Sequence, residues 1–303
     1  MMQRISTGFL LWSLFSTGVS LFASAAWGQE ATAVQRGKLV FQAAGGCGCH
    51  TDVQRSGPFM AGGRPLKTPF GTVYSTNITP AQHTGLGTWS EADFLKAMTR
   101  GVGPKVSHYL PVFPYTSFTN MTEQDVRDLK AYLFSLPPVE RANTPHELPF
   151  PFNWRFPLLF WKWLFFRPGP LQPQPAQTTE WNRGAYLATA LSHCSECHTP
   201  RNMFGALKQS LAYAGSVEGP EGQLAPNITP DPDTGIGNWS VADMVWYLQT
   251  GLKPDGDDTQ GLMSEVIEHG YKHLPESDLR AIAMYLRTRP AIHNKVVKPK
   301  TPS

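Results

Sequence analysis

The sequence predicts an all-α protein built from two tandem copies of one small domain, in which short helices are joined by long glycine-rich loops. Three observations support this prediction: motifs recur at a fixed separation, capping signals mark helix starts, and 27 glycines and 27 prolines interrupt the 303 residues. Hydrophobic residues make up 41% of the chain, so a buried core is expected. The net charge of +3, without a basic stripe, excludes nucleic acid as a partner.

The N-terminus has the pattern of an export signal. Arg4 precedes an apolar run over residues 8–22, and the small residues Ala23-Ser24-Ala25 follow. A basic start, an apolar segment and an A-x-A site are typical of a cleaved signal peptide. We therefore expect residues 1–25 to be removed and the mature protein to act in the periplasm. A retained membrane anchor is the alternative, although the run is short for a bilayer span.

Internal repetition defines the predicted domains. Thr-Asn-Ile-Thr-Pro at 76–80 recurs as Pro-Asn-Ile-Thr-Pro at 226–230, and the segment 84–90 recurs at 234–240, both 150 residues later. In each copy an Arg-Gly pair begins eleven residues before a cysteine. This separation indicates a duplicated domain rather than a solenoid. The predicted layout is a first domain at 29–140, a linker rich in proline and aromatic residues at 141–178, a second domain at 179–292 and a tail at 293–303. The proline content predicts that the linker is extended.

Capping signals predict where the helices begin. Ser90, Thr122 and Ser240 are each followed three residues later by Asp, the spacing of a capping box. The first of these helices is expected to end near Arg100, the second before Pro137-Pro138, and a last helix to run over 275–287. Helices this short bury little surface on their own, so the loops need something to wrap around.

All four cysteines lie in two clusters, Cys47-Gly48-Cys49-His50 and Cys194-Ser195-Glu196-Cys197-His198. The second cluster is a complete Cys-x-x-Cys-His, the pattern of covalent c-type haem attachment. Two thiols one helical turn apart add to the two haem vinyl groups, and the adjacent imidazole reaches the iron from the same side. A zinc site, a redox dithiol and disulfides are the alternatives, but zinc needs further ligands nearby and a redox pair needs no histidine.

The first cluster lacks one residue between its thiols. Either Cys47 and Cys49 both attach haem, with strain at Cys47, or Cys49 alone attaches it and Cys47 stays free. In both cases His50 supplies the iron ligand. A third interpretation is that this copy has lost haem and its cysteines are structural. The surrounding loops are intact, and they favour haem.

Several segments together carry a family resemblance: Gly45-Gly46-Cys47, Ala61-Gly62-Gly63-Arg64, Thr68-Pro69-Phe70-Gly71, both Asn-Ile-Thr-Pro loops and Trp181-Asn182-Arg183-Gly184-Ala185-Tyr186-Leu187. The chain resembles dihaem and multihaem c-type cytochromes, which include the cytochrome subunits of bacterial membrane-bound alcohol and gluconate dehydrogenases. Such subunits usually carry three haem domains, whereas this chain has two. The resemblance implies class I-like cytochrome c domains around two covalent haem c groups, with His50 and His198 as proximal iron ligands.

The resemblance also implies candidates for the sixth iron ligands. Met263 lies on an expected loop ahead of the last helix, where such cytochromes place the distal methionine; a core methionine is the alternative. In the first copy the family's Met-Pro-Tyr reads Phe113-Pro114-Tyr115, and phenylalanine cannot bind iron. His108 is the preferred substitute. Met121 and an open position remain alternatives, since Met121 directly precedes a helix cap and also suits packing.

Other residues have two interpretations each. Trp89 and Trp239 are expected to be core aromatics, while Asn77 and Asn227 shape their turns or bind a haem propionate. Arg64 and Arg201 pair with propionates or lie in solvent. The aromatic segment 161–166 docks a partner or the membrane surface, or packs between the domains.

The function implied is electron transfer from a dehydrogenase to a downstream respiratory acceptor, with association at the membrane surface left open. No catalytic Ser/His/Asp arrangement or phosphate-binding glycine loop stands out, so an electron carrier is preferred to an enzyme. Two alternatives remain: a dihaem oxidase or peroxidase with an open first haem, motivated by Phe113, and a subunit that anchors a dehydrogenase through residues 161–166.

Overall fold

A computed structural model of the chain describes residues 32–297, so the predicted signal peptide at 1–25 and the end of the predicted tail lie outside the described residues. The fold is mostly helical, with 44% helix and 7% strand. The first helix occupies residues 32–43. The helices that follow are α2 (Glu91–Arg100), α3 (Tyr115–Phe118), α4 (Glu123–Phe134), α5 (Pro157–Phe165), α6 (Thr179–Tyr186), α7 (Cys194–His198), α8 (Val241–Thr250), α9 (Gly261–His269) and α10 (Glu276–Arg287).

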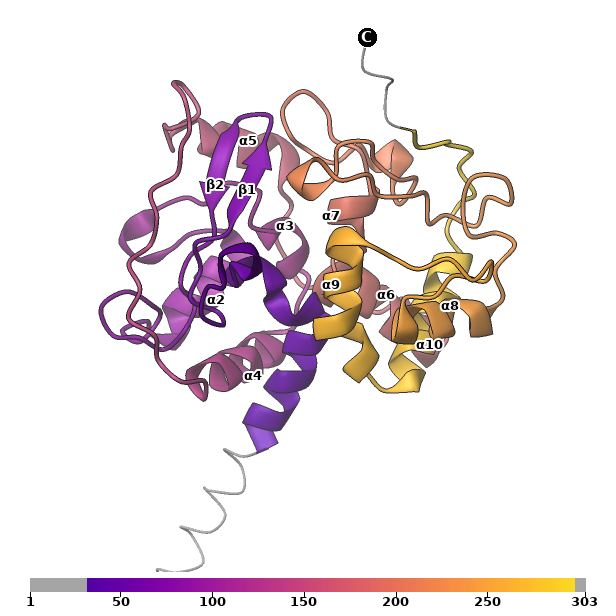
Figure 1. Cartoon of the computed structure of the whole chain (residues 1–303), viewed down its shortest axis with the longest axis horizontal. Coiled ribbons are helices and arrows are strands. Elements are labelled where there is room, and N and C mark those ends of the chain that lie inside the picture. The colour runs from indigo at the N-terminus through magenta and orange to yellow at the C-terminus, as the bar shows by residue number, and fades with distance from the viewer. Residues whose placement is uncertain (1–31, 298–303) are drawn as a thin grey trace, which may run out of the picture.

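The chain forms two halves that lie side by side, residues 32–140 and residues 179–297 (Figure 1). Helix α9 of the second half lies centrally, against the end of the first helix and the 3₁₀ turn η1 (Gly45–His50) that follows it. The division into two tandem domains stays a prediction, but the repeated motifs adopt matching local geometry in both halves.

A helix crossing anchors each half. Arg36 in the first helix forms a bidentate ion pair with Asp128 in α4, and Arg183 in α6 forms one with Asp278 in α10. The glycine after each arginine allows the closest approach: a Cβ on Gly37 would lie 1.8 Å from the Asp128 carbonyl oxygen. The Arg-Gly repeat therefore marks a place where two helices touch backbone to backbone.

The predicted helix starts are confirmed. Ser90 and Ser240 each accept a hydrogen bond from the backbone N–H three residues on, and the aspartate there reaches back to the serine N–H. Thr122 accepts a hydrogen bond from the Asp125 N–H. Helix α4 ends before the proline pair, and α10 covers almost all of the expected range.

Two features differ from the sequence prediction. An antiparallel hairpin, β1 (Pro65–Thr68) and β2 (Gly71–Tyr74), follows the first cysteine cluster, so the fold is not purely α-helical. The linker is not extended throughout, because α5 forms inside it. Pro157 occupies the first position of α5, where its missing N–H costs no hydrogen bond, and the following apolar residues give the helix a face to bury. Within residues 32–297, none of the helices is long and apolar enough to cross a bilayer.

Candidate haem-attachment sites

The second cysteine cluster forms the short helix α7, which begins at Cys194 and ends at His198. Cys194 and Cys197 are three residues apart in this helix and so lie on one face. Burial raises the pKa of both thiols to about 12, the opposite of the lowered pKa of a redox-active cysteine. All four cysteines of the chain are free thiols, without a disulfide. This geometry suits attachment of both sulfurs to one planar group.

The histidine of each cluster is held by the same kind of contact. His50 Nδ1 lies 2.7 Å from the Thr76 carbonyl oxygen, and His198 Nδ1 lies 2.7 Å from the Pro226 carbonyl oxygen. A carbonyl oxygen only accepts, so each Nδ1 carries the proton and Nε2 keeps its lone pair. Burial lowers the pKa of both imidazoles, which favours the neutral form. An iron ligand needs this tautomer and this second contact.

The two Asn-Ile-Thr-Pro loops that supply those carbonyls are fixed by their asparagines. Asn77 accepts hydrogen bonds from Thr79 and donates one to the Val139 carbonyl oxygen at 2.7 Å. Asn227 makes the equivalent bonds, and its donor reaches the Ile292 carbonyl oxygen at 2.8 Å. Both asparagines therefore shape the turn and tie it to the chain that follows the last helix of the half. The structure favours this interpretation over propionate binding.

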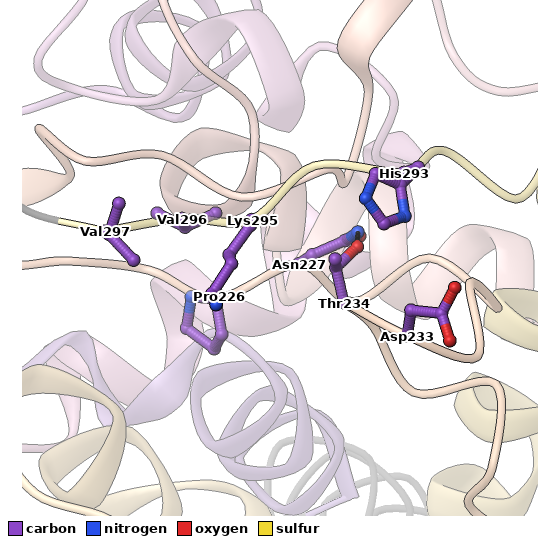
Figure 2. A pocket seen from close by; sticks show the side chains of 8 residues that line it. All are labelled: Pro226, Asn227, Asp233, Thr234, His293, Lys295, Val296 and Val297. Carbon is purple, nitrogen blue, oxygen red and sulfur yellow. Dashed lines mark hydrogen bonds between the residues drawn. The ribbon is translucent and has the colours of Figure 1, made fainter.

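In the second half, the segment after α10 crosses the Asn227 loop; residues 292–297 are called the strap below, and Figure 2 shows most of it. Asn227 and Thr234 lie beside a hollow of about 410 Å³, and the strap carrying His293 and Lys295 passes over it. Thr234 accepts a hydrogen bond from the Asn294 N–H at 3.0 Å, which closes the strap on the loop. The strap thus holds in place the loop whose Pro226 carbonyl oxygen contacts His198.

The first cysteine cluster has a different backbone. In η1, Gly46 and Cys47 both adopt left-handed conformations, with φ of 66° and 49°. Gly45, before them, is also left-handed, with φ of 70°. At the second cluster, His193, the residue before Cys194, is left-handed with φ of 40°, and Cys194 itself begins a helix. Gly45 and Cys47 are thus left-handed where Ser192 and Cys194 are not, and with this tighter backbone His50 still reaches its carbonyl partner. The conformation is unfavourable for a residue with a Cβ, so strain falls on Cys47.

The candidates for the sixth ligands lie in different settings. Met263 is half-buried and packs on the core, but it belongs to α9 rather than to the expected loop. Phe113 packs against Tyr109 and Phe118, with ring centroids 5.8 and 5.7 Å away. Met121 is 2% exposed and lies in the core under α4. Nothing in these contacts assigns a ligand to the first site.

His108 contacts a lysine. Its Nδ1 lies 3.1 Å from the Lys162 Nζ, which also donates to the carbonyl oxygens of Arg100 and Gly101. Burial lowers the pKa of Lys162 to about 8. A protonated Lys162 donates to Nδ1 and leaves the His108 proton on Nε2. Iron binding through Nε2 therefore requires that this contact change.

The two predicted propionate partners pair with carboxylates of the chain itself. Arg64, 3% exposed, lies between Glu221 at 2.8 Å and Glu265 at 2.6 Å. Arg201 lies 2.6 Å from Glu196. Trp89 and Trp239 pack against the core, as expected.

Segment 161–166 does contact both halves. The Trp161 indole donates to the Phe204 carbonyl oxygen at 2.8 Å, and Phe166 packs edge-on against Tyr115 with ring centroids 5.2 Å apart. Its other side, with Trp163 75% exposed, faces solvent.

Sequence reasoning missed three polar residues that the fold brings together. Glu196, inside the second cluster, is buried and accepts hydrogen bonds from Thr116 and Ser117 of the first half. The sequence carries no signal for this contact, because the partners are 79 and 80 residues apart. Among residues 32–297, no three His, Cys, Asp or Glu side chains converge as a site for a bare metal ion.

The paired thiols, the oriented imidazoles and the loops behind them define a covalent haem-binding protein of the c type. A scan against protein-family models finds no match. A dihaem c-type cytochrome from Cereibacter sphaeroides is 44% identical over 266 residues, which cover 85% of this chain and 86% of that protein. The chain belongs to the family of dihaem c-type cytochromes, and the predicted resemblance is confirmed.

Two further relatives are subunits of dehydrogenases. The fructose dehydrogenase cytochrome subunit of Gluconobacter japonicus is 40% identical, and the gluconate 2-dehydrogenase cytochrome c subunit of Pantoea cypripedii is 37% identical. The matches cover 85% and 84% of this chain but only 53% and 59% of those proteins. The chain thus spans little more than half the length of these dehydrogenase subunits.

Proposed function

We propose that this chain is a periplasmic dihaem electron carrier that takes electrons from a dehydrogenase and passes them to a downstream respiratory acceptor. The observation that carries the proposal is the repeated arrangement at His50 and His198, each next to a cysteine and each held through Nδ1 by a loop carbonyl. The dehydrogenase names of two relatives support the choice of donor.

At the second site, Cys194 and Cys197 form the two thioethers, His198 is the proximal ligand and Met263 the distal one. When bound, haem supplies one-electron exchange at its iron. The Pro226 carbonyl holds the His198 imidazole in one tautomer, and the Met263 side chain is half-buried against the core, where it would shield the bound group from water.

At the first site, we propose that Cys49 forms the principal thioether and His50 is the proximal ligand, while Cys47 either attaches with strain or stays free. His108 is the proposed sixth ligand, and its binding to iron requires that Lys162 no longer donate to the His108 Nδ1. Met121 and an open position are the alternatives.

The test is the intact mass of the protein purified from an export-competent host that has its haem-attachment machinery. Two covalent haem increments are expected, on a chain shortened by about 25 residues. One increment would restrict the function to the second site, and a folded protein with none would overturn the proposal.

A second candidate function is favoured by one observation, the aromatic side chain of Phe113 where a ligand is expected. A dihaem oxidase or peroxidase would use an open first iron. Carbon monoxide on the reduced protein and cyanide on the oxidised protein separate the two functions. Rapid binding at one haem favours the enzyme, and no rapid binding at either haem favours the electron carrier.

We also propose that the outer face of α5 rests on an anionic membrane surface. Residues 148–179 contain no Asp or Glu and two arginines, Arg155 and Arg167, besides Lys162, which points inward to the carbonyl oxygens of Arg100 and Gly101. Phe156, Leu159, Phe160 and Trp163 line one exposed apolar hollow along the helix. Aromatic residues with flanking cations are typical of helices that lie in the interface of anionic lipids.

Vesicle sedimentation tests this surface. The haem-loaded protein should bind vesicles containing phosphatidylglycerol more strongly than neutral ones, and Phe160→Ser with Trp163→Ser should abolish the binding. Trp246→Ser is the matched control, because Trp246 is also exposed but lies on α8. Equal binding by the two variants would reject α5 as the membrane contact. If the Phe160/Trp163 variant instead lost only its association with a dehydrogenase, the surface would be a protein interface.

A further inference from the structure

The two halves are joined by polar contacts at both attachment loops. Each contact links a residue in or shortly after the attachment loop of one half to the segment of the other half that adjoins the position of the family's distal methionine, Phe113 in the first half and Met263 in the second. The arrangement is reciprocal, although the residues that make it are not repeated in sequence.

The first contact is centred on Glu196, between the thiols of the second cluster. Glu196 is 6% exposed, and its carboxylate accepts hydrogen bonds from Thr116 Oγ1 at 2.6 Å and Ser117 Oγ at 2.9 Å. Arg201 forms an ion pair with the same carboxylate, with a nitrogen-to-oxygen distance of 2.6 Å. Both hydroxyls belong to α3, which begins two residues after Phe113.

Apolar packing holds α3 in the same place. The Phe118 ring lies edge-on to the ring of His193, which precedes Cys194, with centroids 5.4 Å apart. Phe118 also contacts Phe113 at 5.7 Å. A continuous set of contacts therefore leads from the second attachment loop to the side chain that replaces the distal methionine of the first half.

The reciprocal contact is centred on Arg64, shortly after the first cluster. Its guanidinium donates to both oxygens of Glu265, at 2.6 and 3.1 Å. Glu265 lies on α9, two residues after Met263. Helix α9 also presses on η1, where a Cβ on Gly46 would lie 2.5 Å from the His269 carbonyl oxygen.

We infer that Glu196 is a positioning residue for the first haem pocket and that Arg64 is one for the second. The inference rests on the proposed haem sites. The segment over the sixth position of an iron controls ligand access and burial, and both of these set its reactivity and potential. Because each segment is tied to the other half's attachment loop, a change at one attachment loop alters ligand access at the haem of the other half.

The test of Glu196 removes its partners from the other half. In the haem-loaded Thr116→Val/Ser117→Ala variant, we expect carbon monoxide or cyanide to bind the first haem about tenfold faster than in the parent, because hydrogen bonds to a buried carboxylate are lost. The spectrum of the second haem, including the red charge-transfer band of methionine-ligated ferric iron, should not change.

Thr99→Val/Ser135→Ala is the matched control. These hydroxyls also lie in the first half, but they donate to carbonyls within their own helices, at 2.8 and 2.7 Å. The control should bind ligands at the parent rate. Equal rates in the test and control variants, with two haems present by mass, would overturn the role of Glu196.

Two further variants guard against a folding defect. Glu196→Gln keeps an acceptor for one hydroxyl and should give an intermediate rate at the first haem. Glu265→Gln should weaken the methionine band of the second haem and leave the first haem's ligand rate unchanged. For Glu196→Gln, which lies in the second half, a shift confined to the second haem would contradict the reciprocal arrangement, whereas absence of haem from the parent protein would instead reject the proposed function.

Discussion

The two attachment loops differ by one residue, and the comparison separates what the proximal histidine needs from what the thiols need. Both histidines donate to a loop carbonyl at the same 2.7 Å. The thiols are not equivalent, because Cys194 and Cys197 share a helical face whereas Cys47 and Cys49 are only two residues apart. The fold therefore keeps the proximal histidine in the same position, and the missing residue leaves Cys47 in an unfavourable left-handed conformation.

The largest expected effect distinguishes the thiols of the first loop. Cys49→Ala should lose the first haem, so the intact mass shows one haem increment. Cys47→Ala should keep both, because its left-handed backbone already places Cys47 unfavourably for a bond. If Cys47→Ala loses the haem and Cys49→Ala keeps it, the roles of the two sulfurs are reversed.

Restoring the missing residue sharpens the same comparison. Insertion of a serine between Cys47 and Gly48 produces Cys-x-x-Cys-His and lets the loop form a helical turn like α7. The haem absorption of the inserted variant under alkaline pyridine should then match that of a haem with two thioethers. An unchanged spectrum would show that both sulfurs were already bound or that the loop does not rearrange.

The next effect concerns stability and should be similar in the two halves. Gly37→Ala and Gly184→Ala each place a methyl group less than 2 Å from a carbonyl oxygen of the crossing helix. We expect each to destabilise the fold by about 3 kcal/mol, the cost of overpacking a closed contact. Thermal unfolding of the haem-loaded variants measures it; a loss in one half alone would show that the helix crossings are not equivalent.

A smaller loss is expected at the paired loop asparagines. Asn77→Ala or Asn227→Ala removes the acceptor for a threonine and the tie to the strap, at a cost of about 2 kcal/mol. The exposed Asn238→Ala, which breaks one surface hydrogen bond, is the control. Denaturant unfolding should rank both loop variants below the control, and equal midpoints would remove the structural role assigned to these asparagines.

These residues also show which parts of the fold and of the site can be predicted from the sequence. The capping serines, the Arg-Gly pairs and the loop asparagines act through neighbours at fixed spacing, so their repetition predicted helix starts and shared loops. The contacts of Glu196 and Arg64 join residues from 79 to 201 positions apart, and no local pattern encodes them. The loop expected around Met263 followed from the family resemblance, and the structure instead begins α9 at Gly261, whose φ of 66° is left-handed.

The smallest expected effect tests His108 as the sixth ligand of the first haem. Burial, and then the neighbouring Lys162, lowers the pKa of His108, so its imidazole is neutral, but a protonated Lys162 holds the lone pair of Nδ1. Lys162→Gln keeps a donor for the carbonyls of Arg100 and Gly101 and removes the charge. If His108 is the sixth ligand of the first haem, its Nε2 becomes more available, and cyanide should displace it about threefold more slowly, equivalent to about 0.6 kcal/mol. Lys130→Gln, on α4, controls for the loss of one positive charge in the same half. A cyanide rate that is the same in both variants would exclude His108 and leave Met121 or an open iron at the first site.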